Sequence, residues 1–289
     1  LGLCPTCRMT STTPIKQITL CADDFALHPA VDAAVVALAK AGRLSATSCM
    51  TTAARWPQAA QLLAPLRPAL QVGLHWNLTE GHGQSVQSLL QVLARAYSGR
   101  IDPSAAAESL QRQLDAFEQH TGTPPDFIDG HQHIHQLPGL RQALLQVLRQ
   151  RYGADTSQTP WVRSTLPAQW GINKAALLAL LGGYRLHQML GKAGVRHNRQ
   201  FAGVYGFDAA TPEAYGAHMA AWLHSAPSGT LLMCHPASAA VPGDTISAQR
   251  MVEFAYVASP AFAELLQRSQ AVLVQGAATN FKQKQPLAQ

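Results

Sequence analysis

Strand-length apolar runs alternate with helix-like segments along most of this chain, and that alternation restricts its fold more than any other feature. The first run covers 15–21, and a helix-like segment that begins at Pro29 follows it. There are about eight such pairs, a pattern typical of parallel strands joined by helical crossovers. No internal repeat or linker interrupts the pattern, and neither GxGxxG nor GxxxxGK[ST] marks a nucleotide crevice. We therefore expect a single α/β domain, a distorted parallel (β/α) barrel, rather than an open sheet.

The expected elements follow from the apolar patterns and from the Gly and Pro residues that end them. Strands are expected at 15–21, 44–50, 70–78, 127–129, 161–163, 201–207, 230–235 and 271–275. Helices are expected at 29–41, 56–63, 103–120, 138–151, 174–190, 212–224, 249–258 and 261–268. The barrel would then occupy 15–281, between an irregular N-terminal extension, 1–14, and a frayed tail, 282–289.

The N-terminal extension contains Cys4-x-x-Cys7, the spacing of a zinc knuckle or redox motif, but no second cysteine or histidine pair follows it. Met9 comes directly afterwards. We therefore expect residues 1–8 to be an upstream extension that folding and activity do not require.

The composition excludes several classes of protein. Of the 289 residues, 47% are hydrophobic and only 13% are charged, which indicates a globular core rather than a disordered chain. The net charge is +6, but Lys and Arg are scattered and form no basic face, which argues against nucleic-acid binding. No apolar run is long enough for a membrane span or for a secretory signal, and the five cysteines are an odd number. These features favour a cytoplasmic protein, and a homodimer remains open.

Two adjacent carboxylates, Asp23 and Asp24, end the first apolar run. Neighbouring side chains on a strand point to opposite faces, but a bend at the strand end can bring both to one site. One could then bind a metal while the other holds a water. The alternative is that one of them only caps the helix that starts near Pro29.

Histidines follow two further strands. His75 lies in an apolar run and is either a metal ligand, which we favour, or a core histidine. His131, His133 and His135 alternate after another run: a strand would place all three on one face, whereas a helix would align His131 with His135. Both geometries can bring two imidazoles to one ion. The preceding Asp129 could orient a ligand ring as a hydrogen-bond acceptor without binding the metal itself.

Two more strand ends carry polar candidates. His235 could protonate a leaving group, and Arg163 could pair with an acid at the same rim and contact substrate. No GxSxG elbow is present, and no cysteine has the context of a nucleophile. The residues therefore favour metal-assisted chemistry without a covalent intermediate.

These motifs, in this order, resemble the YdjC/ChbG-like carbohydrate deacetylases, which include chitooligosaccharide deacetylases. The resemblance extends from about residue 17 to about residue 280. The matching segments are Ala22-Asp23-Asp24-Phe25, Gly42-x-Leu44-Ser45-Ala46-Thr47-Ser48, Gly73-Leu74-His75-x-Asn77-Leu78-Thr79, Asp129-Gly130-His131-Gln132-His133-Ile134-His135, Gly203-Val204-Tyr205 and Met233-Cys234-His235-Pro236.

The resemblance implies a distorted α/β barrel that removes acetyl groups from N-acetylated amino sugars with one divalent metal, Mg²⁺ first and Zn²⁺ or another ion as the alternative. It implies that Asp24, His75 and His131 bind the metal, that Asp23 is the general base and that His235 is the general acid. Of these residue roles, the one that the resemblance implies least directly is which carboxylate, Asp23 or Asp24, binds the metal.

This chain departs from the family pattern at two places. Ala26 stands where Gly is usual after Asp-Asp-Phe, and the run 80–83 replaces a Gly-x-Pro turn. Since that second loop borders the substrate in this fold class, the departure concerns sugar specificity more than chemistry.

Two other functions remain as alternatives. One is an amidohydrolase-type barrel, because His131-x-His133 matches its HxH motif, although that motif usually lies on the first strand. A binuclear site would favour it. The other is a carbohydrate-binding relic with a structural metal, which a closed ligand set would favour.

Overall fold

Strand β1 (Lys16–Phe25) lies between β2 (Ala46–Cys49) and β7 (Thr230–Cys234) at the centre of a parallel sheet. The computed structural model describes residues 15–82, 86–153, 159–171 and 173–276. Within these residues the strand order is β5-β4-β3-β2-β1-β7-β6, and β8 (Ala271–Leu273) pairs with the beginning of β1. Every pair is parallel, as the strand–helix alternation predicts.

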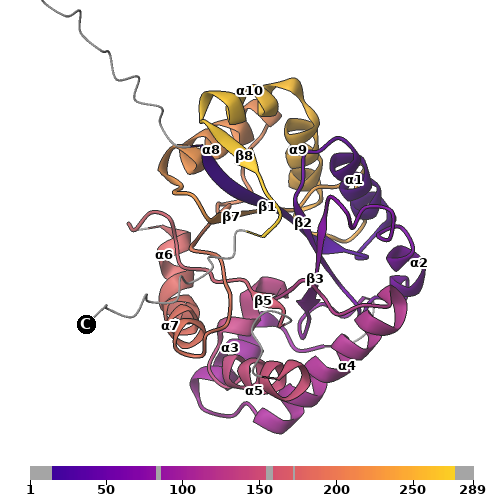
Figure 1. Cartoon of the computed structure of the whole chain (residues 1–289), viewed down its shortest axis with the longest axis vertical. Helices are drawn as coiled ribbons and strands as arrows, with labels where there is room; N and C mark the ends of the chain where they lie inside the picture. The colour runs from indigo at the N-terminus through magenta and orange to yellow at the C-terminus, as the bar shows by residue number, and fades with distance from the viewer. Residues whose placement is uncertain (1–14, 83–85, 154–158, 172, 277–289) are drawn as a thin grey trace, which may run out of the picture.

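Helices surround this sheet (Figure 1). The other strands are β3 (Gln71–Trp76), β4 (Phe127–Gly130), β5 (Trp161–Val162) and β6 (Gln200–Ala202). The helices are α1 (Pro29–Lys40), α2 (Trp56–Ala60), α3 (Leu89–Tyr97), α4 (Pro103–Thr121), α5 (Leu140–Tyr152), α6 (Lys174–Leu178), α7 (Tyr184–Lys192), α8 (Pro212–Ser225), α9 (Ser247–Ala258) and α10 (Pro260–Arg268), with a 3₁₀ turn, η1 (His131–Gln136), and a π turn, η2 (Ala179–Gly183).

The sheet curls until its two edges meet. Isolated parallel bridges join Val162 at the end of β5 to His197, and Pro167 to Phe201 in β6. The backbone N–H of Phe201 also donates to the carbonyl of Leu166 at 2.7 Å. These contacts close a distorted barrel and confirm the fold class expected from the sequence.

One cluster of buried side chains fills the inside of the barrel. This interior cluster consists of Cys21, Ala46, Phe127, Trp161, Phe201, Leu231 and Met233. Phe127 and Trp161 stack with ring centroids 4.3 Å apart. Gly73 supplies no side chain here, and a Cβ at its position would lie 2.5 Å from the Phe127 ring. The barrel interior is therefore a packed core rather than a channel.

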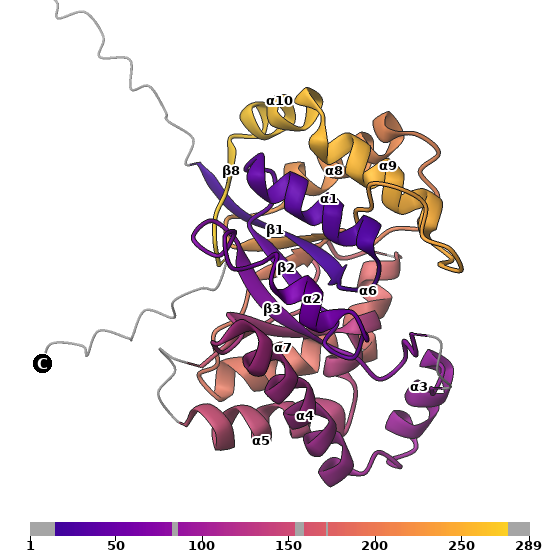
Figure 2. The ribbon, with the colours of Figure 1, turned by 90° about the vertical axis from the view of Figure 1, so that its right-hand side faces the viewer.

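The alternate residues of the strands face outward to the helices. Ile18 and Leu20 of β1 belong to the larger cluster that the helices cover. Figure 2 shows α1, α9 and α10 on one side of the strands and α4 and α5 on the other. The chain therefore buries both faces of every central strand, which explains why these strands are almost continuously apolar.

The helix expected over 174–190 is interrupted. It forms as α6, η2 and α7, because Leu181 and Gly182 leave the helical region. Gly182 has a φ of 128°, and a Cβ there would lie 2.4 Å from the carbonyl oxygen of Gln136. Only glycine allows this close approach, so the π turn follows from the packing of the segment against η1.

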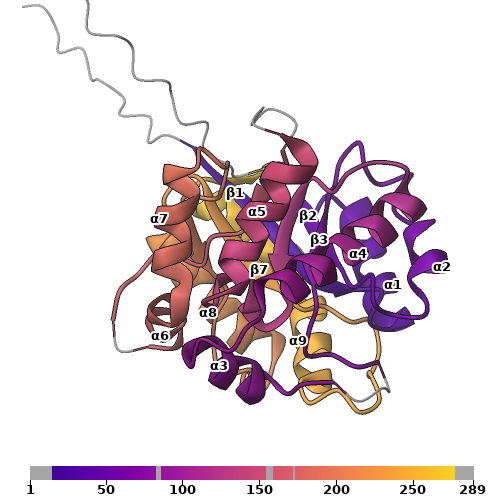
Figure 3. The same cartoon turned by 90° about the horizontal axis from the view of Figure 1, so that it is seen from below.

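Helix α3 is absent from the elements expected from the sequence. Its N-terminus carries a capping box, in which Ser88 accepts from the N–H of Gln91 and Gln91 accepts from the N–H of Ser88. The Ser88-x-x-Gln91 spacing is the sequence signal for the start of this helix. Figure 3 shows α3 beside the α6–α7 segment, and the hydroxyl of Tyr97 donates to the carbonyl of Leu181 at 2.7 Å.

Some expectations fall beyond the part of the chain that the structure describes. The extension 1–14, with Cys4 and Cys7, and the tail 282–289 lie outside it. Cys21, Cys49 and Cys234 are buried free thiols. Among the described helices, none combines the length and the apolar character that crossing a bilayer needs.

Candidate active site

The polar candidates form one layer directly above the interior cluster. Side chains on a strand return to the same face every second residue, so the residue two positions after an inward-facing one also faces inward. Polar residues stand there in six strands or strand ends, namely Asp23, Ser48, His75, Asp129, Arg163 and His235. The carboxyl ends of parallel strands meet at one rim, so the alternation itself assembles this layer.

Asp24 joins the layer through a distortion of β1. Its φ is 67°, and the register between β1 and β2 shifts between Ala22 and Phe25. A regular strand would turn Asp24 to the opposite face from Asp23, whereas this bulge brings both carboxylates to the site. Neither caps α1, since the ring of His28 accepts from the N–H of Ala30 there.

Asp24, His75 and His131 form a group with the geometry of metal ligands. One carboxylate oxygen of Asp24 lies 3.3 Å from Nε2 of His75 and 3.1 Å from Nδ1 of His131. The three ligand atoms lie within 4.8 Å of one another. His75 and Asp24 are buried, while His131 is partly accessible, so an ion held here could keep a coordination position open toward substrate.

A divalent cation fits this group. Nδ1 of His75 lies 2.5 Å from a carboxylate oxygen of Asp129, and that contact favours the tautomer that leaves Nε2 free to bind a metal. Burial alone would lower the pKa of His75, but Asp129, Asp24 and Asp23 outweigh it and raise the pKa to about 10. The surroundings therefore favour positive charge at this point, which a bound cation would supply.

Asp23 belongs to a separate ion pair. Arg163 donates to both of its carboxylate oxygens at 2.6 Å, and the same guanidinium lies 2.6 Å from Asp129. The hydroxyl of Ser48 donates to Asp23 at 3.2 Å. Burial would raise the pKa of Asp23, but Arg163, with His75 and His235, holds it well below its usual value. Asp23 is therefore an anion at neutral pH.

Arg163 lies beneath the site rather than at its surface. Its side chain is 0% exposed, and its guanidinium also donates to the sulfur of Cys21 at 3.2 Å. The pairing with an acid that we expected is present, but a direct contact with substrate does not fit this burial. The geometry instead suits a residue that holds Asp23 and Asp129 in place.

The three alternating histidines take different directions. They form neither a strand nor an α-helix but a 3₁₀ turn, in which Gln132 and His133 have left-handed φ values. His131 faces Asp24, whereas His133 packs edge-on against Phe201. His135 is fully buried, and its Nε2 lies 2.9 Å from the carbonyl oxygen of Arg163. Only one of the three therefore reaches the metal-type group.

His135 should make the fold sensitive to acid. Burial lowers its pKa from 6.5 to about 4, and its Nδ1 has no hydrogen-bond partner among the described residues. Below pH 6.5 the unfolded chain binds a proton on this ring, whereas the native protein excludes it until about pH 4. The contribution of His135 to the free energy of unfolding is therefore complete above pH 6.5 and falls toward pH 4, by up to about 3 kcal/mol.

Urea unfolding at pH 7, 5.5 and 4.5 measures this effect. The pH dependence should be less steep in His135→Gln than in the wild type, while His120→Gln, on the exposed end of α4, should keep the wild-type slope. An unchanged slope in His135→Gln would show that another group carries the acid sensitivity.

His235 follows β7 and is held through its backbone. Its N–H donates to Glu253 of α9 at 2.6 Å, and the hydroxyl of Tyr205 donates to the other oxygen of the same carboxylate at 2.6 Å. Its ring packs edge-on against Phe207 and is partly accessible. The imidazole is therefore free to meet a substrate while its main chain is fixed.

Two important residues on α9 were missed from the sequence. Arg250 donates to the second carboxylate oxygen of Asp24 at 2.7 Å and pairs with Asp244, and Glu253 holds His235. Both are buried, on the same face of α9 as Val257. Charged residues at the i, i+3, i+7 spacing of an apolar stripe were the available signal.

Comparison with known proteins identifies the family of this chain. Residues 17–268 match the profile of the family described as YdjC-like protein. The chain belongs to the YdjC-like family. A solved structure from Enterococcus faecalis V583, named as a candidate cellobiose-phosphate cleavage protein, superposes with a TM-score of 0.67 over 91% of this chain and 98% of that one at 18% identity, which shows a shared fold.

Relatives of this YdjC-like chain include proteins with enzyme names. "Carbohydrate deacetylase" of Homo sapiens is 30% identical over 172 residues, 54% of this chain and 52% of that protein. "Chitooligosaccharide deacetylase" of Yersinia enterocolitica is 33% identical over 132 residues, 43% of this chain and 52% of that protein. The matches thus span about half the length of these relatives.

Proposed function

We propose that this protein hydrolyses the acetamide of an N-acetylated amino sugar or sugar conjugate, giving acetate and a free amine. Asp24, His75 and His131 would hold one divalent metal ion. The observation that carries the proposal is that this ligand set shares a rim with a separate ionised carboxylate, Asp23. The deacetylase names of the relatives in the same family support it.

The donor set of one carboxylate and two imidazoles suits Zn²⁺ and similar transition-metal ions, and the carboxylate also accepts Mg²⁺. When bound, such an ion supplies Lewis-acid chemistry, which polarises a carbonyl and makes a water more acidic. Arg250 neutralises the other oxygen of Asp24 and keeps that carboxylate in place. Asp129 contacts Nδ1 of His75 and keeps that ring in place.

The remaining residues move protons. Asp23 accepts the proton that water loses as its oxygen attacks the acetyl carbon, and Arg163 fixes the direction of this carboxylate. His235, at the end of the neighbouring strand β7, donates a proton to the sugar nitrogen as the C–N bond breaks. Glu253 holds the His235 backbone in position for that transfer.

A second group of ligand-type residues lies near the first, but a cationic side chain already sits among them, which disfavours a binuclear amidohydrolase site. Cys21, Asp23 and Asp129 are close enough together to hold an ion. However, Arg163 contacts all three, at 3.2, 2.6 and 2.6 Å. A cationic side chain thus already occupies the space between these groups, which argues for one metal rather than two.

Acetate release tests the proposal. We expect the purified protein, supplied with Mg²⁺ or Zn²⁺, to release acetate from N-acetylglucosamine oligomers or conjugates. Exhaustive chelation should silence it, and readdition of the ion should restore it. Undiminished activity after chelation would point to another mechanism, and two ions per chain would favour the amidohydrolase alternative. Binding of sugar without hydrolysis under every metal condition would favour the carbohydrate-binding relic.

A further inference from the structure

Two residues in the turn at the end of β1 have left-handed backbone conformations although neither is glycine. The φ of Asp24 is 67° and that of Ala26 is 75°. In this region the Cβ of an L-residue crowds the following carbonyl oxygen, so such a conformation persists only where its surroundings hold it. Since Asp24 is one of the three candidate metal ligands, the contacts that hold this turn also decide where its carboxylate points.

A buried carboxylate on α1 contacts the backbone of this turn. One oxygen of Asp32 accepts from the N–H of Ala26 at 2.7 Å, and the other pairs with Arg55. Ala26 and Asp32 are 0% and 1% exposed, so water could not replace the carboxylate as an acceptor for this N–H. The hydrogen bond therefore stabilises the conformation in which the Ala26 N–H points at α1.

The contacts of Asp32 are not those of a helix cap. It lies in the first turn of α1, but its oxygens contact Ala26, outside the helix, and Arg55, while the ring of His28 caps α1. Burial raises the pKa of Asp32 above its usual value, and Arg55 and the Ala26 N–H oppose that rise. A carboxylate in this place costs free energy through desolvation, so helix formation alone does not account for it.

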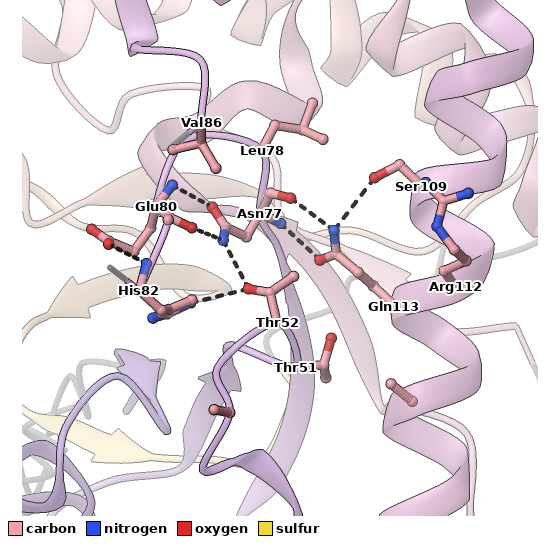
Figure 4. A pocket seen from close by; sticks show the side chains of 13 residues that line it. Thr51, Thr52, Asn77, Leu78, Glu80, His82, Val86, Ser109, Arg112 and Gln113 are labelled. Carbon is pink, nitrogen blue, oxygen red and sulfur yellow. Dashed lines mark hydrogen bonds between the residues drawn. The ribbon is translucent and has the colours of Figure 1, made fainter. Parts of the chain in front are cut away.

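Arg55 reaches Asp32 from a segment that is itself fixed. The segment joins β2 to α2, and the N–H of Met50 at its start donates to the carbonyl of the last residue of β1 at 2.8 Å. Figure 4 shows Thr52 of the same segment beside Asn77, whose amide donates to the Thr52 hydroxyl at 2.8 Å. Hydrogen bonds therefore join the turn, α1 and the segment after β2 in one network.

We propose that Asp32 is a positioning residue for the metal ligand Asp24. Its hold on the N–H of Ala26 keeps the turn left-handed, and that conformation directs the Asp24 carboxylate to the two imidazoles of the ligand set. The inference rests on the proposed metal site. Because position 26 is alanine and not glycine, the turn depends on this contact rather than on the conformational freedom of its own residues.

Metal affinity is the main test. When metal-free protein is titrated with Zn²⁺, and separately with Mg²⁺, the Kd should be about 10-fold higher in Asp32→Ala than in the wild type, the lower end of the loss expected for a residue that supports a ligand. Asp32→Asn keeps an oxygen that can accept from Ala26, so its Kd should stay within about 3-fold of the wild type. If Asp32→Ala does not fold, Asp32→Ser takes its place, because the shorter side chain also loses Ala26 but can bond within α1.

Relief of the backbone strain tests the route through Ala26. Ala26→Gly removes the Cβ that disfavours the left-handed conformation, so adding it to Asp32→Ala should bring the Kd back to within about 3-fold of the wild type. A purely structural role for Asp32 would change the melting temperature and leave no loss of affinity to restore. Glu118→Ala is the matched control: it removes a carboxylate that contacts Arg151 and Tyr152 of α5, so the melting temperature should fall while the Kd stays unchanged.

The outcomes separate this inference from the proposed metal site. If the wild type binds an ion and Asp32→Ala binds it equally well, or if Ala26→Gly restores none of the lost affinity, the inference is overturned while the metal site stands. If the wild type binds neither ion, the metal site fails, and amide hydrogen exchange of residues 25–27 decides on Asp32. Faster exchange in Asp32→Ala than in the wild type would support its hold on the turn, and equal exchange would overturn that as well.

Discussion

Asp23→Asn should lower kcat by about 10²–10⁴-fold while the metal content stays near that of the wild type. The substitution is nearly isosteric, and it removes the negative charge that would accept a proton from water. Arg163 keeps Asp129 as an ionic partner, so the layer should remain folded. Steady-state kinetics of acetate release, metal analysis and a thermal melt on the same preparation measure the three quantities.

His235→Ala is the companion variant, at the end of the strand next to β1. It should lower kcat by a comparable factor with the metal retained, because it removes the group that would donate a proton to the leaving amine. If Asp23→Asn instead empties the metal site and Asp24→Asn does not, the two carboxylates exchange roles.

Metal content should fall well below one ion per chain in Asp24→Ala, His75→Ala and His131→Ala, and acetate release should be lost with it. Each substitution removes a donor atom from a set of three, so the loss of affinity should exceed the ~10–100-fold that removing a supporting partner costs. Metal analysis after dialysis against Mg²⁺ and against Zn²⁺ measures occupancy and identifies which ion the site prefers.

His133→Ala is the matched control for this series. It removes a histidine from the same 3₁₀ turn, but its ring faces Phe201 rather than Asp24, so metal content should not change. Full occupancy in all three ligand variants would rule out the assigned site. Loss of metal in His133→Ala would show that the turn rearranges when an ion binds.

The sequence predicted the layer of the site well because one simple rule governs it. Asp23, His75, Asp129, Arg163 and His235 each end an apolar strand, and parallel strands bring such ends to one rim. Strand alternation alone predicts that these residues lie close together. It does not predict which of them pair with one another, because pairing depends on side-chain length and on depth within the barrel.

Three parts of the site depend on local backbone geometry or on distant segments. The left-handed conformation of Asp24 arises from a bulge that no short pattern marks, since the residue is not glycine. The separation of His131 from His135 comes from left-handed residues within η1. The contact of Arg250 with Asp24 joins residues 226 positions apart, and strand or helix periodicity carries no information about such a pair.

Helix α9 has a consequence for any attempt to transplant this chemistry to another scaffold. Arg250 and Glu253 are three residues apart on it, a rise of about 4.5 Å. One contacts the carboxylate of Asp24 and the other the backbone of His235, so a single rigid helix sets the spacing between these two groups. Copying the strand ends alone would omit that spacer, and a graft would need α9, in its original register, as part of the transferred unit.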